Sequence, residues 1–278
     1  MSQRAVIIPA HNEAAVIEET LRTLLSGMLP DEVTVIVAAN GCTDDTVARA
    51  RAVASWITVL DIAEPGKAGA IRAAEAQLGP GSRLYLDADI CMPASSARAV
   101  FDRLEAGAGG ARPPAVLDLN EVSWLVSSFH RARGRLGSVQ SEFSGGGCYG
   151  LSWETRQLFG DFPDVLGDDL FAARIVPKGR AEIIDAPPVL IRPPRDRRSL
   201  SRVLARNVRG NRQLSGLFPD IAAPTTKQTL LSLVRSVRGP KSLADALVYA
   251  GFVTAGRVTA QRNNVRWERD DSSRQRSA

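Results

Sequence analysis

Two aspartates spaced two residues apart, Asp87 and Asp89, are the side chains of this sequence best suited to chemistry. They follow residues 82–86, whose pattern indicates a short buried strand. Carboxylates at the carboxyl end of a parallel strand stand where open α/β sheets bind ligands. Such a pair can hold a hard divalent cation and leave coordination sites open for phosphate oxygens. Acidic pairs also occur as solvated turn residues, so the surrounding pattern must decide between the two interpretations.

A second acidic pair, Asp168 and Asp169, opens a predicted helix. Carboxylates favour the first turn of a helix because the helix dipole is positive there, and this is the simplest account of the pair. Two adjacent carboxylates in a closing site can also raise one another's pKa toward the range in which one acts as a general base.

The elements that would position these groups alternate regularly over the first hundred residues. Apolar spacing marks helices between the strands, including one at residues 67–78, and a further helix after the last strand. This βαβαβαβ order predicts an α/β fold with a doubly wound, mostly parallel, Rossmann-like sheet. The strands are expected at residues 5–8, 33–37, 56–60 and 82–86, and three later strands at 115–117, 181–185 and 189–191.

The charge of the 278-residue chain is divided unevenly along its length. The net charge is +5, but residues 192–278 carry 18 Lys/Arg against 6 Asp/Glu, whereas residues 1–191 carry 17 against 24. We therefore predict a catalytic domain over residues 1–191 and a basic, mostly helical extension over residues 192–278. The basic part would attract phosphates of a nucleotide, an anionic lipid or a nucleic acid.

The extension also contains an apolar stripe at helical spacing. Its longest uncharged run, residues 246–256, has 11 residues, whereas a bilayer span needs about 20. The stripe can lie on an anionic membrane surface or pack on the catalytic domain, and the sequence leaves both open. Its members are Ala244, Leu247, Val248, Gly251, Phe252 and Ala255.

The compartment is predicted from cysteine usage and the first residues. The three cysteines are widely spaced and odd in number, which is typical of reduced thiols. The apolar run at residues 5–8 is too short for the core of a signal peptide. We expect a cytoplasmic protein. If the stripe binds lipid, we expect peripheral attachment to the inner face of the membrane.

Six motifs in order make residues 4–215 similar to an inverting family 2 glycosyltransferase with a GT-A fold. The resemblance implies an enzyme that moves a sugar from a UDP- or GDP-type donor to an acceptor hydroxyl. Residues 1–110 would form the nucleotide-sugar half and residues 111–191 the acceptor half. The motifs are Pro9-Ala10-His11-Asn12-Glu13, residues 40–46, residues 66–70, Asp87-Ala88-Asp89, Gly145-Gly146-Gly147 and Asp168-Asp169.

The resemblance also implies a divalent metal, Mg²⁺ or Mn²⁺, on the first acidic pair. Asp89 would hold the ion against the donor diphosphate, and Asp87 would support the ribose or the water shell of the metal. A cation at this place would stabilise the charge that develops on the leaving group.

The other donor-binding residues would come from the ends of the first strands and the third helix. Pro9, Glu13 and Asn40 would face the ribose and the base, and Lys67 would meet phosphate or ribose oxygens. Arg209 would clamp a phosphate, although residues 206–210 lack the Gln and Trp that many members carry in this segment.

On the acceptor side, the resemblance makes Asp169 the general base, with Asp168 in place of the usual neighbouring Glu. Gly146 and Gly147 would let the backbone approach the sugar or the acceptor closely. The acceptor would be lipid-linked or a polysaccharide. His11 is expected to orient backbone, and His130 is a lone histidine on a predicted helix.

Two alternatives belong to other functional classes. A sugar-phosphate nucleotidyltransferase should carry a glycine-rich first loop, but residues 9–13 contain no glycine. A basic nucleic-acid-binding protein should interleave aromatic residues with its arginines, but aromatic residues are 5% of the chain and lie elsewhere. We therefore expect no nucleic-acid partner.

Overall fold

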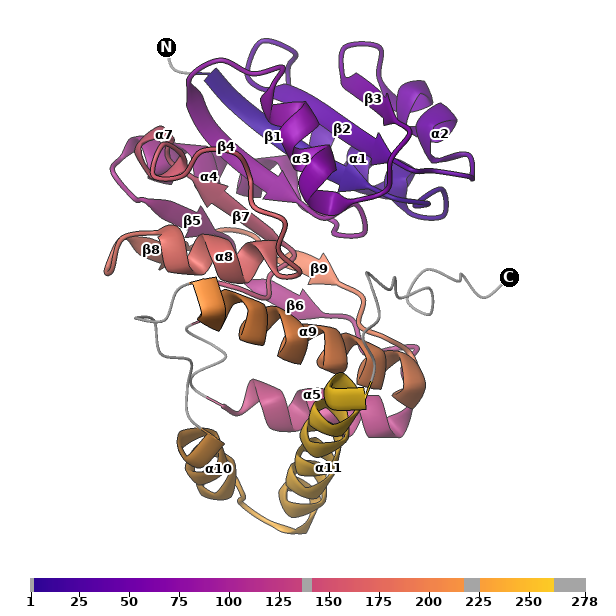
Figure 1. The fold of residues 1–278 in the computed structure, drawn as a ribbon, viewed down its shortest axis with the longest axis vertical. Helices are drawn as coiled ribbons and strands as arrows, with labels where there is room; N and C mark the ends of the chain where they lie inside the picture. Colours follow the sequence, from indigo (N-terminus) through magenta and orange to yellow (C-terminus); the bar gives the residue numbers. More distant parts are fainter. Residues whose placement is uncertain (1–2, 137–141, 218–225, 263–278) are drawn as a thin grey trace.

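The computed structural model describes residues 3–136, 142–217 and 226–262. Figure 1 shows a twisted central sheet with helices on its two faces and a layer of further helices beneath its carboxyl-terminal part. The seven strands of the sheet have the order β3-β2-β1-β4-β7-β5-β8. This arrangement confirms the predicted α/β fold.

The first four strands form the parallel half of the sheet, because β1 pairs in parallel with β2 and β4, and β2 with β3. The third strand lies two residues later than predicted, and the third helix ends three residues earlier. The strands are β1 (Gln3–Ala10), β2 (Thr34–Asn40), β3 (Thr58–Ile62) and β4 (Gly81–Leu86). The helices are α1 (Ile17–Leu25), α2 (Thr46–Val53), α3 (Lys67–Glu75) and α4 (Ala94–Glu105).

Alternate residues of these strands bury opposite faces of the sheet, as the pleat requires. Val6 and Leu84 pack with α1 and α4 on one face, whereas Ile7 and Tyr85 pack with α3 on the other. A strand buried on both faces is apolar at nearly every position, which explains the unbroken apolar runs in β1 and β2.

The second half of the sheet is mixed. β7 (Cys148–Leu151) runs antiparallel to both β4 and β5 (Gly110–Arg112), and β8 (Ala181–Ile183) pairs in parallel with β5. A small separate sheet joins β6 (Ala115–Leu117) to β9 (Val189–Ile191). β6, β8 and β9 are the three later strands expected from the sequence, and β8 ends two residues earlier than predicted. The short helix α7 (Trp153–Arg156) follows β7, and α8 (Asp168–Ile175) covers the same face as α3.

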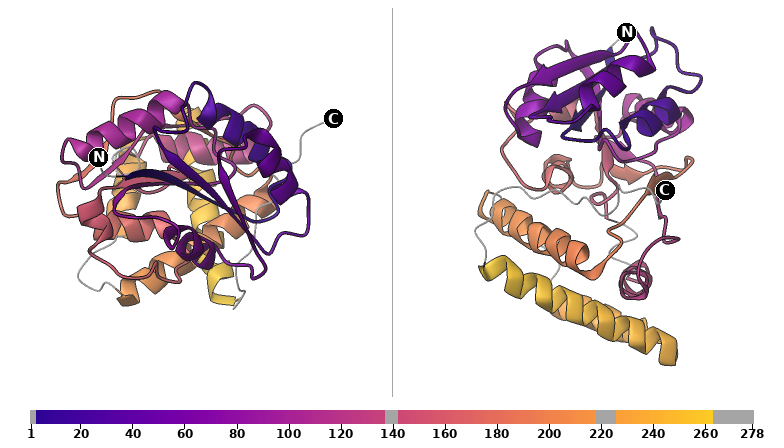
Figure 2. Two further views of the ribbon diagram at one scale, coloured as in Figure 1. Left: turned by 90° about the horizontal axis from the view of Figure 1, so that it is seen from above. Right: turned by 90° about the vertical axis from the view of Figure 1, so that its right-hand side faces the viewer.

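The basic extension is helical where it is described. It comprises α9 (Arg197–Leu217), α10 (Thr226–Arg235) and α11 (Pro240–Arg262), and residues 263–278 lie outside the described residues. Figure 2 shows α9 and α11 side by side below the sheet. The helix α5 (Trp124–Gly134), which the sequence placed in the acceptor half, packs against α9 and α11.

The apolar stripe predicted on α11 packs in part and is exposed in part. Its members Val248 and Phe252 pack against Phe129 of α5 and the neighbouring α9. Tyr249 stacks on Phe129 of α5 with ring centroids 5.1 Å apart, and Ala246 is buried beside Leu233 of α10. Leu247, a stripe residue, is instead 66% exposed. Among the described helices, none combines the length and the apolar character needed to cross a membrane.

A buried ion pair fastens α11 to α5. Asp245 of α11 is 2% exposed and lies 2.8 Å from Nη2 of Arg131 and 3.1 Å from Nη1 of Arg135. Burial alone would raise the pKa of Asp245, but hydrogen bonds from the two arginines lower it below its ordinary value. The carboxylate therefore stays ionised in the fold at neutral pH.

We predict that Asp245→Asn destabilises the fold by about 2 kcal/mol, because it leaves two half-buried guanidinium groups without their counter-charge. Since the native pKa is lowered, this contribution is present at neutral pH and is lost as the pH falls through that pKa. Denaturant unfolding at pH 7 and at pH 3 measures both effects. The matched control is Asp102→Asn, whose carboxylate is 67% exposed and pairs with Arg4. Equal losses for the two variants would contradict the role of Asp245.

Candidate active site

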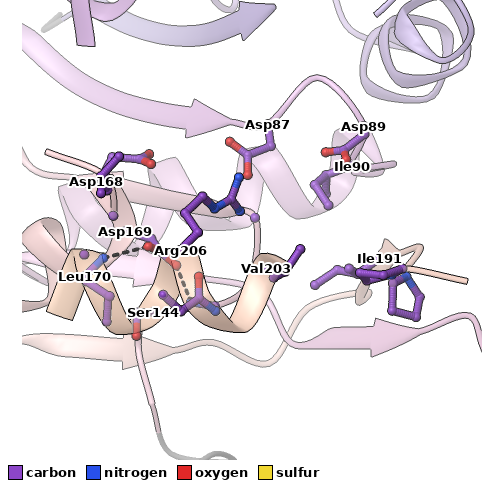
Figure 3. A pocket seen from close by; sticks show the side chains of 18 of the residues that line it. Asp87, Asp89, Ile90, Ser144, Asp168, Asp169, Leu170, Ile191, Val203 and Arg206 are labelled. Carbon is purple, nitrogen blue, oxygen red and sulfur yellow. Dashed lines mark hydrogen bonds between the residues drawn. The ribbon is translucent and has the colours of Figure 1, made fainter. Parts of the chain in front are cut away.

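A cavity of about 780 Å³ lies at the carboxyl ends of β1, β2 and β4, between the sheet and α9. Figure 3 shows the two acidic pairs facing this cavity from β4 and α8. Gly146 and Arg209 do not line it. The predicted residues that do line it are Pro9, Glu13, Asn40, Lys67, Asp87, Asp89, Gly147, Asp168 and Asp169.

Lys67 joins the two acidic pairs. Its Nζ lies 2.6 Å from Oδ1 of Asp87 and 2.7 Å from Oδ1 of Asp168. Burial would lower the pKa of Lys67, but the charges of Asp168 and Asp87 outweigh burial and raise it. The side chain is therefore an ammonium ion held between two carboxylates, and its expected contact with phosphate or ribose oxygens stays a prediction.

Asp168 is held on both of its oxygens. While Oδ1 accepts from Lys67, Oδ2 accepts from the hydroxyl of Tyr149 at 3.1 Å. The Tyr149 ring stacks on Tyr85 of β4, with centroids 4.8 Å apart. Burial and then the charge of Asp168 raise the pKa of Tyr149, so the phenol remains a hydrogen-bond donor. This environment suits Asp168 to positioning rather than to proton transfer.

Two backbone amides of the described residues orient Asp169. Its Oδ2 accepts from the amide of Gly145 at 2.6 Å, and its Oδ1 from the amide of Leu170 at 2.8 Å. Burial and the neighbouring Asp168 raise the pKa of Asp169, although the two backbone hydrogen bonds and Lys67 oppose them. A carboxylate in a fixed orientation with a raised pKa has the properties of a general base.

The turn that carries Asp87 and Asp89 is supported by the glycine-rich segment before β7. The Asp87 amide donates to the carbonyl of Gly147 at 2.9 Å. Gly147 has φ +65°, and a Cβ there would lie 2.5 Å from Cγ1 of Ile90. The close backbone approach predicted for Gly147 is therefore made to the turn of the protein itself. Gly146 is buried against Arg112.

The electrostatics of this turn favour a cation. Burial raises the pKa of Asp87 to about 6, with Lys67 lowering it and the carboxylates of Asp168 and Asp89 raising it further. Within the described residues, no three His, Cys, Asp or Glu side chains are placed to hold a metal ion together. Magnesium-like ions are often held by one or two carboxylates together with water and substrate phosphates. The pair therefore fits a metal shared with a diphosphate, and not one enclosed by protein.

The strand ends hold the scaffold of the cavity. The Asn40 amide donates to the carbonyl of Ala10 at 2.9 Å and accepts from the amide of Gly66 at 2.8 Å. Asn40 thus fixes the end of β1 and the entry to α3, a use of its amide that the sequence did not indicate. Nδ1 of His11 lies 2.5 Å from the Asn40 carbonyl, which agrees with the expected backbone-orienting role of this histidine. Glu13 is buried at the edge of the cavity.

Arg206 lines the cavity three residues before Arg209. Figure 3 shows its side chain rising from α9 toward the Asp87 turn. The two arginines lie three residues apart on a helix, so sequence spacing alone did not separate them. The phosphate-clamping role expected for Arg209 is therefore better suited to Arg206.

His130 on α5 is a cavity residue that the sequence did not assign. It is 8% exposed, and neither ring nitrogen has a hydrogen-bond partner within the described part of the chain. Burial and the charge of Arg133 lower the pKa of His130 to about 4, so the ring is neutral at pH 7. Its helical spacing with Val126 and Phe129 is that of a core residue, which concealed its place at the cavity.

Comparisons with known proteins agree with this geometry. Residues 5–135 match the Glycosyl transferase family 2. A mannosyltransferase, PcManGT from Pyrobaculum calidifontis, solved in complex with GDP-Man and Mn²⁺, has a TM-score of 0.67 and 20% identity over 95% of this chain and 88% of its own. Glucosyl-3-phosphoglycerate synthase from Mycobacterium tuberculosis, solved with Mn²⁺ and UDP, has a TM-score of 0.40 and 24% identity over 55% of this chain and 58% of its own. Among curated proteins, none matches the sequence.

We predict that Lys67→Gln makes the stability of the protein fall as the pH rises. Without the ammonium, Asp87 and Asp168 repel each other and the pKa of Asp87, which Lys67 lowers, rises further. Ionisation of Asp87 then costs stability at higher pH. Denaturant unfolding should show a loss of about 2–3 kcal/mol at pH 8 that shrinks toward pH 5. Lys178→Gln, at an exposed lysine, is the control. A loss that is the same at both pH values would refute the ion-pair account.

Proposed function

Because residues 5–135 match the Glycosyl transferase family 2, we propose that this protein transfers a sugar from a UDP- or GDP-type donor to an acceptor hydroxyl in a single inverting displacement. One observation carries the proposal: Lys67 holds the Asp87 turn and the Asp168–Asp169 pair at the same cavity. A single displacement needs both a stabilised leaving group and a base within one site.

The donor diphosphate would lie at the Asp87 turn. Asp89 and Asp87 would hold Mg²⁺ or Mn²⁺ there, and the ion would neutralise the charge that develops on the leaving diphosphate. Arg206 reaches the same turn, and its planar guanidinium is suited to bidentate pairing with phosphate oxygens. Glu13, which follows β1 and lines the cavity, would accept a hydrogen bond from a ribose hydroxyl.

Asp169 would remove the proton of the acceptor hydroxyl. The amides of Gly145 and Leu170 hold its carboxylate in one orientation, and its raised pKa brings it closer to the working pH. Lys67 and Tyr149 donate hydrogen bonds to the two carboxylate oxygens of the neighbouring Asp168. Asp168 is thus a positioning residue in this mechanism, and Asp169 alone is the base.

Neither the nucleotide nor the acceptor follows from the fold. A structure similar to this one binds GDP-Man, which makes GDP the first nucleotide to compare with UDP. Neutral His130 and cationic Arg133 line the far end of the cavity, and they would meet the hydroxyl and anionic groups of a lipid-linked or polysaccharide acceptor. The family match favours a glycosyltransferase over both the nucleotidyltransferase and the nucleic-acid-binding alternative.

Asp169→Asn should keep donor binding and lose turnover. The amide has the size of the carboxylate but cannot take a proton, and loss of a general base costs about 10²–10⁴-fold in rate. Single-turnover transfer, together with calorimetric titration of the donor nucleotide, separates the two effects. A variant that retains wild-type turnover would exclude Asp169 as the base.

Asp89→Ala should lose the metal-dependent part of nucleotide binding. The substitution removes a ligand oxygen from the turn, whereas Asp61→Ala removes an exposed carboxylate on β3 and serves as the matched control. Titration of each variant with nucleotide, with and without Mn²⁺, measures the difference. Equal nucleotide affinity for Asp89→Ala and Asp61→Ala in the presence of metal would remove the metal assignment.

A further inference from the structure

A second cavity lies in the helical layer and shares no lining residue with the active site. It is an apolar groove of about 600 Å³ between α5, α9 and α11. Leu125 of α5 and the stripe residues Val248, Gly251, Phe252 and Ala255 of α11 line it. Part of the stripe found in the sequence therefore forms one wall of an open groove, beside the contact that Phe252 makes with Phe129 of α5.

The exposed surface of α11 continues the apolar character of the groove. Leu243 is 50% exposed, Leu247 66% and Val258 43%. Positions 243, 247, 251, 255 and 258 fall within one face of the helix and extend over about 22 Å of its length. A solvent-exposed apolar face of this length is typical of an interaction site.

Two arginines stand at the rim of the groove. Arg197 and Arg198, at the beginning of α9, line it and are exposed. Within the described residues, neither has an acidic partner, whereas the nearby Arg195 pairs with Glu121. An aliphatic groove with two such guanidinium groups at its mouth is complementary to an anionic amphiphile.

The charge of α11 points to a membrane and away from a second copy of this chain. Its one acidic residue, Asp245, is buried in the ion pair with α5. Its exposed charged residues, Lys241 and Arg257, are basic. Two copies joined by this face would set like charges opposite each other, whereas an anionic lipid surface would neutralise them.

We propose that the groove holds an acyl chain of an anionic membrane phospholipid, with its phosphate on Arg197 and Arg198, so that the exposed face of α11 lies on the membrane surface. The inference does not depend on which sugar or nucleotide the active site uses. In this proposal the basic extension binds lipid, whereas the acidic cavity binds the sugar donor.

Flotation with vesicles tests the role of the arginines. The wild-type protein should float with phosphatidylcholine vesicles that contain phosphatidylglycerol and not with phosphatidylcholine alone, and added salt should release it. The double variant Arg197→Ser/Arg198→Ser should lower the partition coefficient by about 30-fold, as expected for two cations at an anionic surface. Arg51→Ser/Lys178→Ser removes two exposed charges from the catalytic domain and should leave binding unchanged.

A groove-filling variant separates chain insertion from adsorption by charge. A Cβ at Gly251 meets no atom within 4 Å, so Gly251→Leu fills the groove without straining the helix, and Gly251→Ala is its control. Trp124, which is 70% exposed and adjoins Leu125, reports on the groove. Lipids with brominated acyl chains should quench the fluorescence of Trp124 in the wild type and in Gly251→Ala, but much less in Gly251→Leu. The substitution Trp124→Phe should remove this quenching.

Three results would overturn the proposal. They are equal flotation with and without anionic lipid, wild-type flotation of the double arginine variant, and gel filtration that shows a dimer which Gly251→Leu dissociates. The last result would identify a second copy as the occupant. Nucleotide titration of the same variants should match the wild type, so a failure at the groove is distinguishable from a failure of the proposed transferase activity.

Discussion

The ammonium of Lys67 lies between two carboxylates that come from distant parts of the chain and would otherwise repel each other. It connects the start of α3 to the end of β4 and to the first turn of α8. Because Asp168 is buried and Asp87 is partly buried, a cation between them stabilises their two negative charges. The positions of the metal turn and of the proposed base therefore depend on one side chain, and Lys67 acts as scaffold more than as ligand.

Main-chain hydrogen bonds and a close glycine contact also position residues of the site. Gly147 allows the segment before β7 to pass beneath the Asp87 turn and accept its amide hydrogen, and Gly145 donates to Asp169. The amide of Asn40 fixes the entry to α3 in the same way. Main-chain hydrogen bonds thus hold the side chains of Asp169 and Asn40, whereas side-chain contacts from Lys67 hold Asp87 and Asp168.

The sequence predicted the parts of the fold and of the candidate site that depend on local residue patterns. The first four strands, the doubly wound sheet and the carboxylates at the end of β4 follow from periodicity and from the rule that ligands meet strand ends. Contacts between residues far apart in the sequence could not be predicted in this way, because Lys67 and Asp168 are separated by 101 positions. The sequence also could not tell which of Arg206 and Arg209 lines the cavity, because the two differ only in their position around the helix. The sequence left open whether the stripe of α11 packs, and the structure shows Val248 and Phe252 packed but Leu247 exposed. A helix that is apolar on several faces gives no unique packing face.

The central claim is that the cavity binds a nucleotide diphosphate through a divalent metal at the Asp87 turn. Calorimetric titration of the wild-type protein with GDP and with UDP, each with and without Mn²⁺, tests it most directly. The account predicts micromolar binding of one nucleotide that disappears when the metal is removed. Binding that is equally strong without metal, or no binding of either nucleotide with metal present, would contradict it.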